Sequence, residues 1–357
     1  MATGATSALA MAAPVAASAS PGWRSVYQTP AGAGSPEVFG DVAALGPANA
    51  WAVGQSWTAA GLRVAHWNGK GWKPVVLPSG LSAGLSGPSL NVVTASSPSN
   101  VWAFGSAGYR GLGIHWDGKR WTRRLFAPRS QIWNAAALGP RGGTWVLGST
   151  CVNGCRNWIQ RYDGRTWRQM AIPTVRGYKV GLQAMHARSG TDVWVTGGIS
   201  RPSSGSKTIA AHWNGKRWRV ILGPKVPLRE GLGFLFTDVV GYGPKNVRMT
   251  GTIKSMGEGS HRGGLLAHWN GSRWTHLRVN EKQGLEKLAV DGRGGLWALS
   301  GSHRSLLHIA KGKVDRRYTP QVGGKGQAFG LTHIPGTTSL WAVGLSGRLG
   351  TIWKYGK

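Results

Sequence analysis

The chain has 357 residues, 41% of them apolar, so it is long enough to bury a sizeable core. Its 57 glycines and 20 tryptophans favour short strands joined by tight turns over helices. The 43 Lys and Arg outnumber 12 Asp and Glu, and the net charge of +31 predicts attraction to anionic polymers without specifying a fold. No segment reaches about 18 consecutive apolar residues, so no membrane-spanning helix is expected.

Residues 1–20, MATGATSALAMAAPVAASAS, carry no charge and are rich in alanine. Ala17 and Ala19 are placed as in an A-x-A cleavage site, which is typical of the end of a secretory signal. We therefore expect a signal-peptide-like leader over 1–20, a single domain over 21–357 and secretion of the product. An unstructured Ala-rich tail is the alternative.

A seven-residue motif recurs along the rest of the chain. It reads HWNGKGW (66–72), HWDGKRW (115–121), RYDGRTW (161–167), HWNGKRW (212–218) and HWNGSRW (268–274). A W-x-x-G element precedes each copy, and its seven versions begin at Trp51, Trp102, Trp145, Trp194, Arg248, Trp297 and Trp341. A period of about 40–50 residues with Asn-Gly or Asp-Gly turns between apolar runs is typical of propeller blades. The sequence thus predicts an all-β fold, a seven-bladed β-propeller of four-stranded antiparallel blades.

The two ends of the chain supply the last blade together. The seventh copy stops at IWKYGK (352–357), before its fourth strand, whereas GWRSVYQTP (22–30) matches the segment that follows the first Asn-Gly turn. Pairing of these ends would hide a sheet edge and close the ring. We expect the repeated Trp to pack between blades, with sugar stacking as the alternative, and the recurring His to be structural rather than metal-binding. The sixth copy, HIAKGKV (308–314), lacks both tryptophans and should pack most loosely.

The only two cysteines, Cys151 and Cys155, lie in CVNGC. In an exported chain they can form a small disulfide ring. Free thiols are the alternative. Zinc requires about four ligands, and the chain has no second cysteine pair to complete such a set, so we expect neither a metal nor a cofactor.

These repeats carry a family resemblance. W-A-V-G followed by H-W-N-G-x-x-W, repeated after an Ala-rich leader, resembles the secreted β-propeller proteins of actinomycetes, over residues 22–357. The resemblance implies the fold and implies little about activity. DGRTW (163–167) is also similar to the Asp-box of sialidase-like propellers, S-x-D-x-G-x-T-W, but lacks the residue between Asp and Gly. The Arg-Ile-Pro motif of sialidases is absent.

Candidate ligand-binding residues fall at two places in the repeat. Polar residues at the expected mouth of the central channel, ten or eleven residues before each W-x-x-G element, are Asp41, Asn91, Asn134, Gln183, Asp238 and Lys287. Aromatic residues expected in loops between middle strands, on the same face, are Trp57, Tyr109 and Trp158. Converging polar groups and loop aromatics predict a ligand site at this face. The alternative is that the polar residues cap strands and hold channel water, and that the aromatics lie buried under loops.

Basic residues follow the outer turns instead. They are Lys70, Lys119, Arg120, Arg123, Arg124, Arg165, Lys216, Arg217, Arg219, Arg316 and Arg317. Their recurrence predicts a positively charged ring on the opposite face and outer rim, with salt-sensitive polyanion binding. The alternative is that the protein tolerates a high isoelectric point and that these charges bind no partner. Expected partners are acidic polysaccharide, teichoic acid or another cell-envelope polyanion, or a protein; DNA would bind without specificity.

Three functions remain open. The first is a monomeric, non-enzymatic binding or scaffold propeller. The second is a hydrolase or lyase acting on polysaccharide at the channel mouth, since glycoside hydrolysis needs two carboxylates about 5–10 Å apart. Asp41 and Asp238 lie on units one and five, so we expect them far apart, which leaves Asp238 with Glu230 or Glu258 as the pair to test. The third is a nucleic-acid-binding propeller inside the cell.

Overall fold

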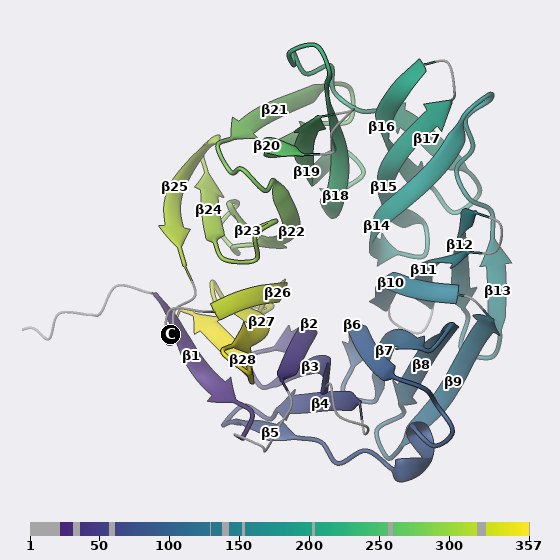
Figure 1. Ribbon diagram of the computed structural model, residues 1–357, viewed down its shortest axis with the longest axis vertical. Helices are drawn as coiled ribbons and strands as arrows, with labels where there is room; N and C mark the ends of the chain where they lie inside the picture. Colours follow the sequence, from purple (N-terminus) through teal and green to yellow (C-terminus); the bar gives the residue numbers. More distant parts are fainter. Residues whose placement is uncertain are drawn as a thin grey trace, which may run out of the picture.

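The computed structural model describes residues 22–30, 36–56, 61–128, 130–137, 143–151, 154–201, 204–255, 260–319 and 326–356. They form seven four-stranded antiparallel sheets, arranged as blades around a central axis (Figure 1). The predicted seven-bladed β-propeller is therefore confirmed. Among these residues no helix is long and apolar enough to cross a membrane.

The blades are numbered here in chain order. Blade 1 consists of β2 (Glu37–Gly46), β3 (Asn49–Ser56), β4 (Leu62–Trp67) and β5 (Trp72–Pro74). Blade 2 consists of β6 (Pro88–Ser97), β7 (Asn100–Ala107), β8 (Arg110–Trp116) and β9 (Trp121–Pro128). Blade 3 consists of β10 (Ser130–Ala137), β11 (Thr144–Cys151), β12 (Cys155–Tyr162) and β13 (Trp167–Met170). Blade 4 consists of β14 (Lys179–Ser189), β15 (Asp192–Arg201), β16 (Ser204–Trp213) and β17 (Trp218–Leu222).

The remaining blades follow the same order. Blade 5 consists of β18 (Leu232–Gly243), β19 (Asn246–Ser255), β20 (His261–Trp269) and β21 (Trp274–Val279). Blade 6 consists of β22 (Leu285–Val290), β23 (Leu296–Ser300), β24 (Leu306–Ala310) and β25 (Lys313–Tyr318). Blade 7 consists of β26 (Gly326–His333), β27 (Leu340–Ser346), β28 (Leu349–Tyr355) and β1 (Trp23–Gln28). A 3-10 helix, η1 (Ser79–Leu81), lies between blades 1 and 2.

Closure of the ring follows the expected route. The fourth sheet position in blade 7 is taken by β1, which pairs antiparallel with β28. Trp23 pairs with Tyr355 just as Trp72 pairs with Trp67 in blade 1. The N-terminal strand therefore occupies the position that the last strand has in every other blade, and the prediction is confirmed.

The topology defines two faces. The connections into each first strand, and those between second and third strands, lie on one face, here called the top face. The turns between first and second strands, and the Asn-Gly or Asp-Gly turns between third and fourth strands, lie on the other, the bottom face. In the first such turn the Asn68 side chain accepts the backbone N–H groups of Lys70 and Gly71, and Gly69 adopts a positive φ of 89°.

A β-bulge explains the glycine of the W-x-x-G element. In all seven blades the pairing of first and second strands shifts by one residue at the same place, between Phe39 and Asp41 in blade 1. A Cβ on Gly54 would lie 1.9 Å from the carbonyl oxygen of Val38, next to this bulge. A side chain at Gly54 would therefore clash with the neighbouring backbone, whereas blade 6 has the same register shift with Ser300 at the equivalent position.

Aromatic residues join neighbouring blades. The Trp of each W-x-x-G element faces the aromatic pair of the next blade: Trp341 lies 5.1 Å from Trp67 and 5.2 Å from Trp72, measured between ring centroids. Trp297 likewise meets Trp23 at 5.4 Å and Tyr355 at 4.8 Å across the closing interface. Such aromatic pairs contribute about 0.5–1.5 kcal/mol each beyond the area that they bury.

The histidine of the motif packs within its own blade. His115 stacks on Trp102 with ring centroids 4.2 Å apart, and its Nε2 lies 2.9 Å from Oδ1 of Asn100. His212 stacks on Trp194 in the same way and meets a carboxylate, that of Asp192, at 2.9 Å. These contacts account for the recurrence of histidine at this strand position.

Two departures from the repeat meet at one interface. Blade 5 has Arg248 where other blades have tryptophan, and blade 6 has Ile309 and Val314 where the next blade's aromatic pair would stand. Ile309 belongs instead to an aliphatic cluster that includes Leu266 of blade 5 and Leu296 of blade 6. Blades 5 and 6 are thus joined by an aliphatic core, and neither blade has at this interface the aromatic residues that the repeat places at the others.

Candidate functional site

The strand register separates the predicted channel residues into two groups. In one group the residue pairs with the third residue of its own W-x-x-G or equivalent element. This group consists of Asp41, Asn134, Asp238 and Lys287. In blades 2 and 4 this ladder position belongs to Val92 and Ala184. Asn91 and Gln183 are the bulged residues one position earlier, and both are exposed. Their predicted equivalence with Asp41 was therefore wrong, because a bulge changes the residue count within a strand. The side chain of Asn134 lies outside the described ones.

Three charges from different blades interact inside the channel. Burial raises the pKa of the Asp41 and Asp238 carboxyls, an effect that the Lys287 ammonium partly offsets. Burial alone would lower the pKa of Lys287, but the Asp238, Asp41 and Glu286 carboxylates outweigh it and raise that pKa. One lysine on blade 6 is thus within electrostatic range of both carboxylates, which come from blades 1 and 5.

The absence of a side chain in blade 7 helps to explain this grouping. Gly330 occupies the same ladder position between blades 6 and 1, and a Cβ there would lie 2.7 Å from Cα of Asp41. Blade 7 therefore places no side chain between Lys287 and Asp41 at this ladder position. In the sequence the three charged residues each lie ten residues before their W-x-x-G or equivalent element, whereas Gly330 lies eleven residues before Trp341.

Both carboxylates also join adjacent blades. Oδ2 of Asp41 accepts the backbone N–H of Val93 at 2.9 Å, and Oδ2 of Asp238 accepts that of Leu288 at 2.8 Å. In each case the acceptor lies on one blade and the donor on the first strand of the next. Buried carboxylates held in this way satisfy buried backbone donors. The arrangement supports a structural role for these two residues, while ligand binding in the channel stays a prediction.

The residues proposed as a catalytic pair are only partly described. Glu258 lies outside the described residues, so the structure does not test Asp238 with Glu258. Glu230 is exposed on the connection into β18, whereas Asp238 is 9% exposed and is bonded to Leu288. The described residues bring no second carboxylate into hydrogen-bond contact with Asp238.

The three loop aromatics have different environments. Tyr109, in the top-face turn between β7 and β8, is 86% exposed and free to contact a partner. Trp57 lies outside the described residues. The loop position expected for Trp158 was wrong: it lies within β12, opposite Gly148, and packs against a buried cluster that contains Phe104.

The cysteines lie at the top of blade 3. The β11–β12 ladder pairs Cys151 with Cys155, and Cys155 is disulfide-bonded. Among the described residues no group of three or more His, Cys, Asp and Glu is placed to hold a metal ion.

A cavity of about 330 Å³ opens on the top face between blades 4 and 5. Its lining includes Gln183, one of the predicted ligand-binding residues, together with Phe234, Leu235, Lys207 and Lys254. The bulge in β14 exposes Gln183 here. Apolar side chains beside two lysines suit a ligand or peptide with both apolar and anionic groups.

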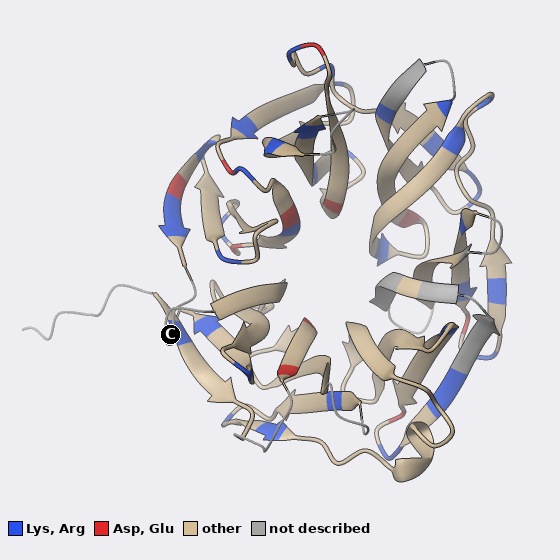
Figure 2. Cartoon of the chain, viewed as in Figure 1, with Lys and Arg blue, Asp and Glu red and all other residues tan. Residues whose placement is uncertain are grey.

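The predicted polyanion-binding residues are all exposed. Figure 2 shows Lys and Arg along outermost strands such as β9, β13 and β25. Asp and Glu lie on β2, β18 and β22 near the axis, and also on β25 and in outer loops. Exposed positions in the bottom turns and outer strands are those of Lys70, Lys119, Arg120, Arg123, Arg124, Arg165, Lys216, Arg217, Arg219, Arg316 and Arg317. These residues, here called the basic rim, therefore share a face and an edge of the molecule.

Few acidic groups oppose them. In the described part of the chain the exposed acids are Asp117, Asp163, Glu230 and Asp315. Asp117 and Asp163 accept backbone N–H groups of their own turns, and Asp163 also pairs with Arg168 at 3.0 Å. Asp315 meets His308 at 2.6 Å. Within the basic rim, Arg120, Arg316 and Arg317 pair with Asp117, Asp315 and Glu281 at 3.9, 4.0 and 2.7 Å. The other eight cations of the rim make no ion pair with the described residues.

Comparison with solved structures finds several β-propellers that are similar to this chain over most of its length. The virginiamycin B lyase of Staphylococcus aureus, solved with quinupristin, is 13% identical, covers 95% of this chain and 100% of its own, and has a TM-score of 0.61. YCF48 bound to D1 peptide is 17% identical over 94% of this chain and 97% of its own, with a TM-score of 0.56. The β-propeller domain of Cps50 (Swd1) from Myceliophteria thermophila is 11% identical over 93% and 99%, with a TM-score of 0.58.

At these identities the likeness shows the propeller fold alone. No family model matches the chain, and no curated protein matches it. The neighbours include a lyase and a protein solved with a bound peptide, so function has to be argued from this chain's own surfaces.

Proposed function

We propose that this chain is a non-enzymatic binding propeller that holds a negatively charged polymer against its bottom face and outer rim. The observation that supports the proposal is the separation of charge: cations project from the exposed turns and outer strands, whereas most carboxylates are buried or engaged with neighbours. Long-range attraction of this kind speeds encounter with anionic partners and weakens as salt rises.

Repetition around the ring strengthens the proposal. Lys119 of blade 2, Arg165 of blade 3 and Lys216 of blade 4 occupy equivalent places in successive bottom turns. Each cation binds weakly alone, but a polymer that reaches several blades makes its later binding steps intramolecular and gains avidity. A flexible anionic chain fits this geometry better than a single small ligand.

The leader predicted over 1–20 supports export, and we propose that the polymer belongs to the cell envelope or its surroundings. Acidic polysaccharide or a teichoic-acid-like phosphate polymer would then meet the protein more readily than a genome. DNA would bind by the same electrostatics without reading sequence.

The test is retention of the full chain on immobilised acidic polysaccharide, teichoic acid, neutral glycan and DNA, at a series of salt concentrations. A variant that neutralises three bottom-face cations, Lys119→Gln, Lys216→Gln and Arg217→Gln, should bind less tightly and lower the log–log salt slope by roughly one for each cation that had bound the polymer. The matched control is Arg176→Gln, Lys282→Gln and Arg304→Gln, which removes the same charge from exposed top-face positions. Equally weakened binding in both variants would show that net charge alone acts and would overturn a bottom-face site.

A second candidate rests on the cavity between blades 4 and 5. YCF48 was solved with a bound peptide, and here Phe234 and Leu235 stand beside Lys207 and Lys254 at the top face. A protein partner could insert a segment with an apolar residue next to an acidic one. Binding that resists salt, and that Phe234→Ala abolishes while the bottom-face variant leaves it intact, would favour this candidate.

A further inference from the structure

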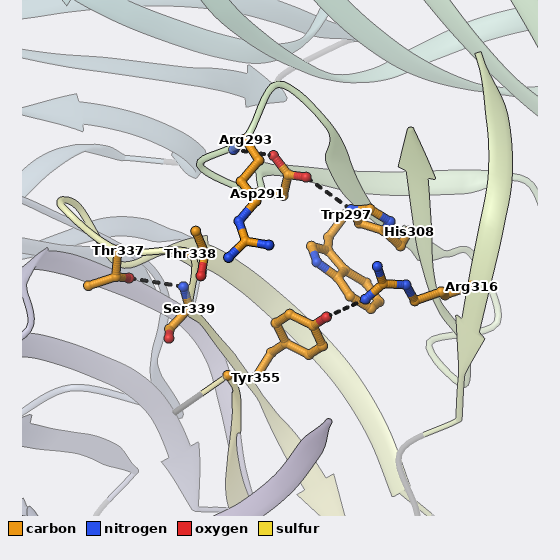
Figure 3. Close-up of a pocket in the computed structure, with 10 residues that line it drawn as sticks. Asp291, Arg293, Trp297, His308, Arg316, Thr337, Thr338, Ser339 and Tyr355 are labelled. Carbon is orange, nitrogen blue, oxygen red and sulfur yellow. Dashed lines mark hydrogen bonds and ion pairs between the residues drawn. The ribbon is translucent and has the colours of Figure 1, made fainter. Parts of the chain in front are cut away.

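A larger cavity, of about 510 Å³, opens on the bottom face between blades 6 and 7. Figure 3 shows Arg293 and Thr338 on one side of it and Arg316 and Tyr355 on the other, all facing the same space. Trp297 and Tyr355, which are 1% and 9% exposed, form its buried floor. This volume falls within the range of about 300–1,000 Å³ that is typical of small-molecule sites.

Local features of the chain produce the cavity. The turns between first and second strands comprise only residues 47–48 in blade 1 and 98–99 in blade 2, but residues 291–295 in blade 6 and 334–339 in blade 7. Both longer turns contribute to the lining. Blade 7 also has no Asn-Gly turn, because Tyr355 and Trp23 pair at the two ends of the chain where other blades have that turn. The cavity therefore lies beside the closure of the ring.

Two guanidinium groups face the cavity from different blade elements. Arg316 of β25 donates from Nη1 to the hydroxyl of Tyr355 at 2.7 Å, which fixes its position across the blade interface. The Arg293 side chain comes from the turn after β22 and makes no hydrogen bond or ion pair with the described residues. The hydroxyl of Thr338 lies on the same side as Arg293 (Figure 3).

The one carboxylate in the lining is already engaged. Asp291 accepts the backbone N–H groups of Arg293 and Gly295 at 2.7 and 2.8 Å through Oδ1, and its Oδ2 meets Nε2 of His308 at 3.0 Å. Burial would raise the pKa of Asp291, but the hydrogen bonds from His308, Arg293 and Gly295 outweigh it and lower that pKa. Asp291 thus opposes an incoming anion less than a free carboxylate would, and its backbone bonds position the turn that carries Arg293.

We propose that this cavity binds a phosphate group carried on a small polyol or sugar, such as one repeating unit of a phosphate polymer. The inference rests on the proposed function and names the chemical group that one site of the bottom face selects. Guanidinium groups that approach from opposite sides suit a tetrahedral oxyanion, which presents acceptor oxygens in every direction, better than a planar carboxylate. The volume beyond that of a bare oxyanion accommodates the polyol, and the Thr338 hydroxyl supplies it with a hydrogen-bond partner.

The experiment is calorimetric titration of the full chain with glycerol 3-phosphate, inorganic phosphate, glucuronate and glycerol. We expect glycerol 3-phosphate to bind more tightly than inorganic phosphate or glucuronate, and glycerol to give no signal. Arg293→Gln should weaken glycerol 3-phosphate about tenfold or more, as removal of a charge-assisted hydrogen bond does. The control is Arg273→Gln, an exposed bottom-turn cation of blade 5 outside the cavity, which should leave the affinity unchanged.

Because the Arg293 side chain makes no hydrogen bond or ion pair with the described residues, its variant should keep the melting temperature of the parent and test the site without unfolding it. Arg316→Gln, measured with its melting temperature, provides a second variant. Equal weakening by Arg293→Gln and Arg273→Gln would overturn the site, as would glucuronate binding at least as tightly as glycerol 3-phosphate. Retention on phosphate polymer without binding of glycerol 3-phosphate would refute this inference and leave the proposed function standing. Binding of glycerol 3-phosphate without retention on any polymer would refute the proposed function and leave the cavity as a small-molecule site.

Discussion

At the scale of single residues, the channel places one ammonium group within electrostatic range of two carboxylates. Lys287 interacts with carboxylates from blades 1 and 5, which the chain separates by almost two hundred residues. Since burial raises the pKa of both carboxyls, their ionisation costs folding free energy, and that cost is limited by the ammonium between them.

Lys287→Met should therefore destabilise the protein by roughly 1–2 kcal/mol at neutral pH, because it removes the cation that favours ionisation of both carboxyls. Groups whose folded-state pKa is raised stabilise the fold below their ordinary pKa and lose that contribution as pH rises through the raised value. Removal of Lys287 raises both values further, so the deficit should shrink as pH falls toward the ordinary Asp value of 3.8. Chemical denaturation across pH measures this, with exposed Lys282→Met as the control. A deficit that does not vary with pH would indicate impaired packing alone.

Arg248 gives a prediction of opposite sign. It replaces the interblade tryptophan, burial lowers its pKa, and its Nη1 is buried with no hydrogen-bond partner among the described residues. Arg248→Met keeps the aliphatic stem and removes the unsatisfied donor, so it should raise stability by about 1 kcal/mol. Thermal unfolding beside the exposed control Arg278→Met tests this. A lower melting temperature would contradict this account and mean that the guanidinium contributes more to stability than its burial costs.

At the scale of strands, one side chain of β1, that of Trp23, makes the aromatic contacts that join this strand to blades 6 and 7. Trp23 is 8% exposed and contacts Trp297, Tyr318 and Tyr355 with ring centroids 5.4–5.9 Å away. Trp23→Ala should cost about 3–5 kcal/mol, as other buried aromatic truncations do. Val26 of the same strand is 37% exposed, so Val26→Ala should cost well under about 1 kcal/mol. Chemical denaturation of both variants tests this, through the denaturant concentration at which each is half unfolded. Similar destabilisation by both would show that β1 stabilises the ring mainly through its backbone hydrogen bonds.

The same strands show what the sequence could predict. Blade number, turns and closure followed from local chemistry, since Asn-Gly turns and the interrupted seventh copy leave direct marks in the chain. The bulge in each first strand left none beyond the glycine opposite it, so Asn91 and Gln183 were assigned to the wrong ladder position. The electrostatic interaction of Asp41 with Lys287 crosses blade 7, where Gly330 has no side chain, and such interactions across a ring require the assembled structure.

At the scale of the whole molecule, the ring resists opening because its ends lie inside one sheet. Five residue pairs join β1 to β28, so the chain ends separate only if that ladder breaks. Interfaces between complete blades, such as that of blades 1 and 2, are joined chiefly by side-chain packing that includes Trp51, Trp116 and Trp121. The position of the chain ends therefore determines which kind of interaction keeps the ring closed.

A circular permutant separates these contributions. Tyr355 would be joined to Trp23 through Asn-Gly-Lys-Gly, the sequence that joins Trp67 to Trp72, and new ends would be opened between Ser79 and Gly80, which are exposed. Every blade then comes from one continuous segment, and the ring can open between blades 1 and 2 without breaking a ladder. We expect the permutant to keep the native circular dichroism spectrum but to unfold about tenfold faster or more in denaturant, because ring opening no longer requires breakage of β-sheet hydrogen bonds. The parent sequence with the same Asn-Gly-Lys-Gly segment appended after Lys357 is the control for the added residues. If the permutant unfolds at the parent's rate, side-chain packing between complete blades suffices to hold the ring, and the shared blade serves to cover the edge of β28 instead.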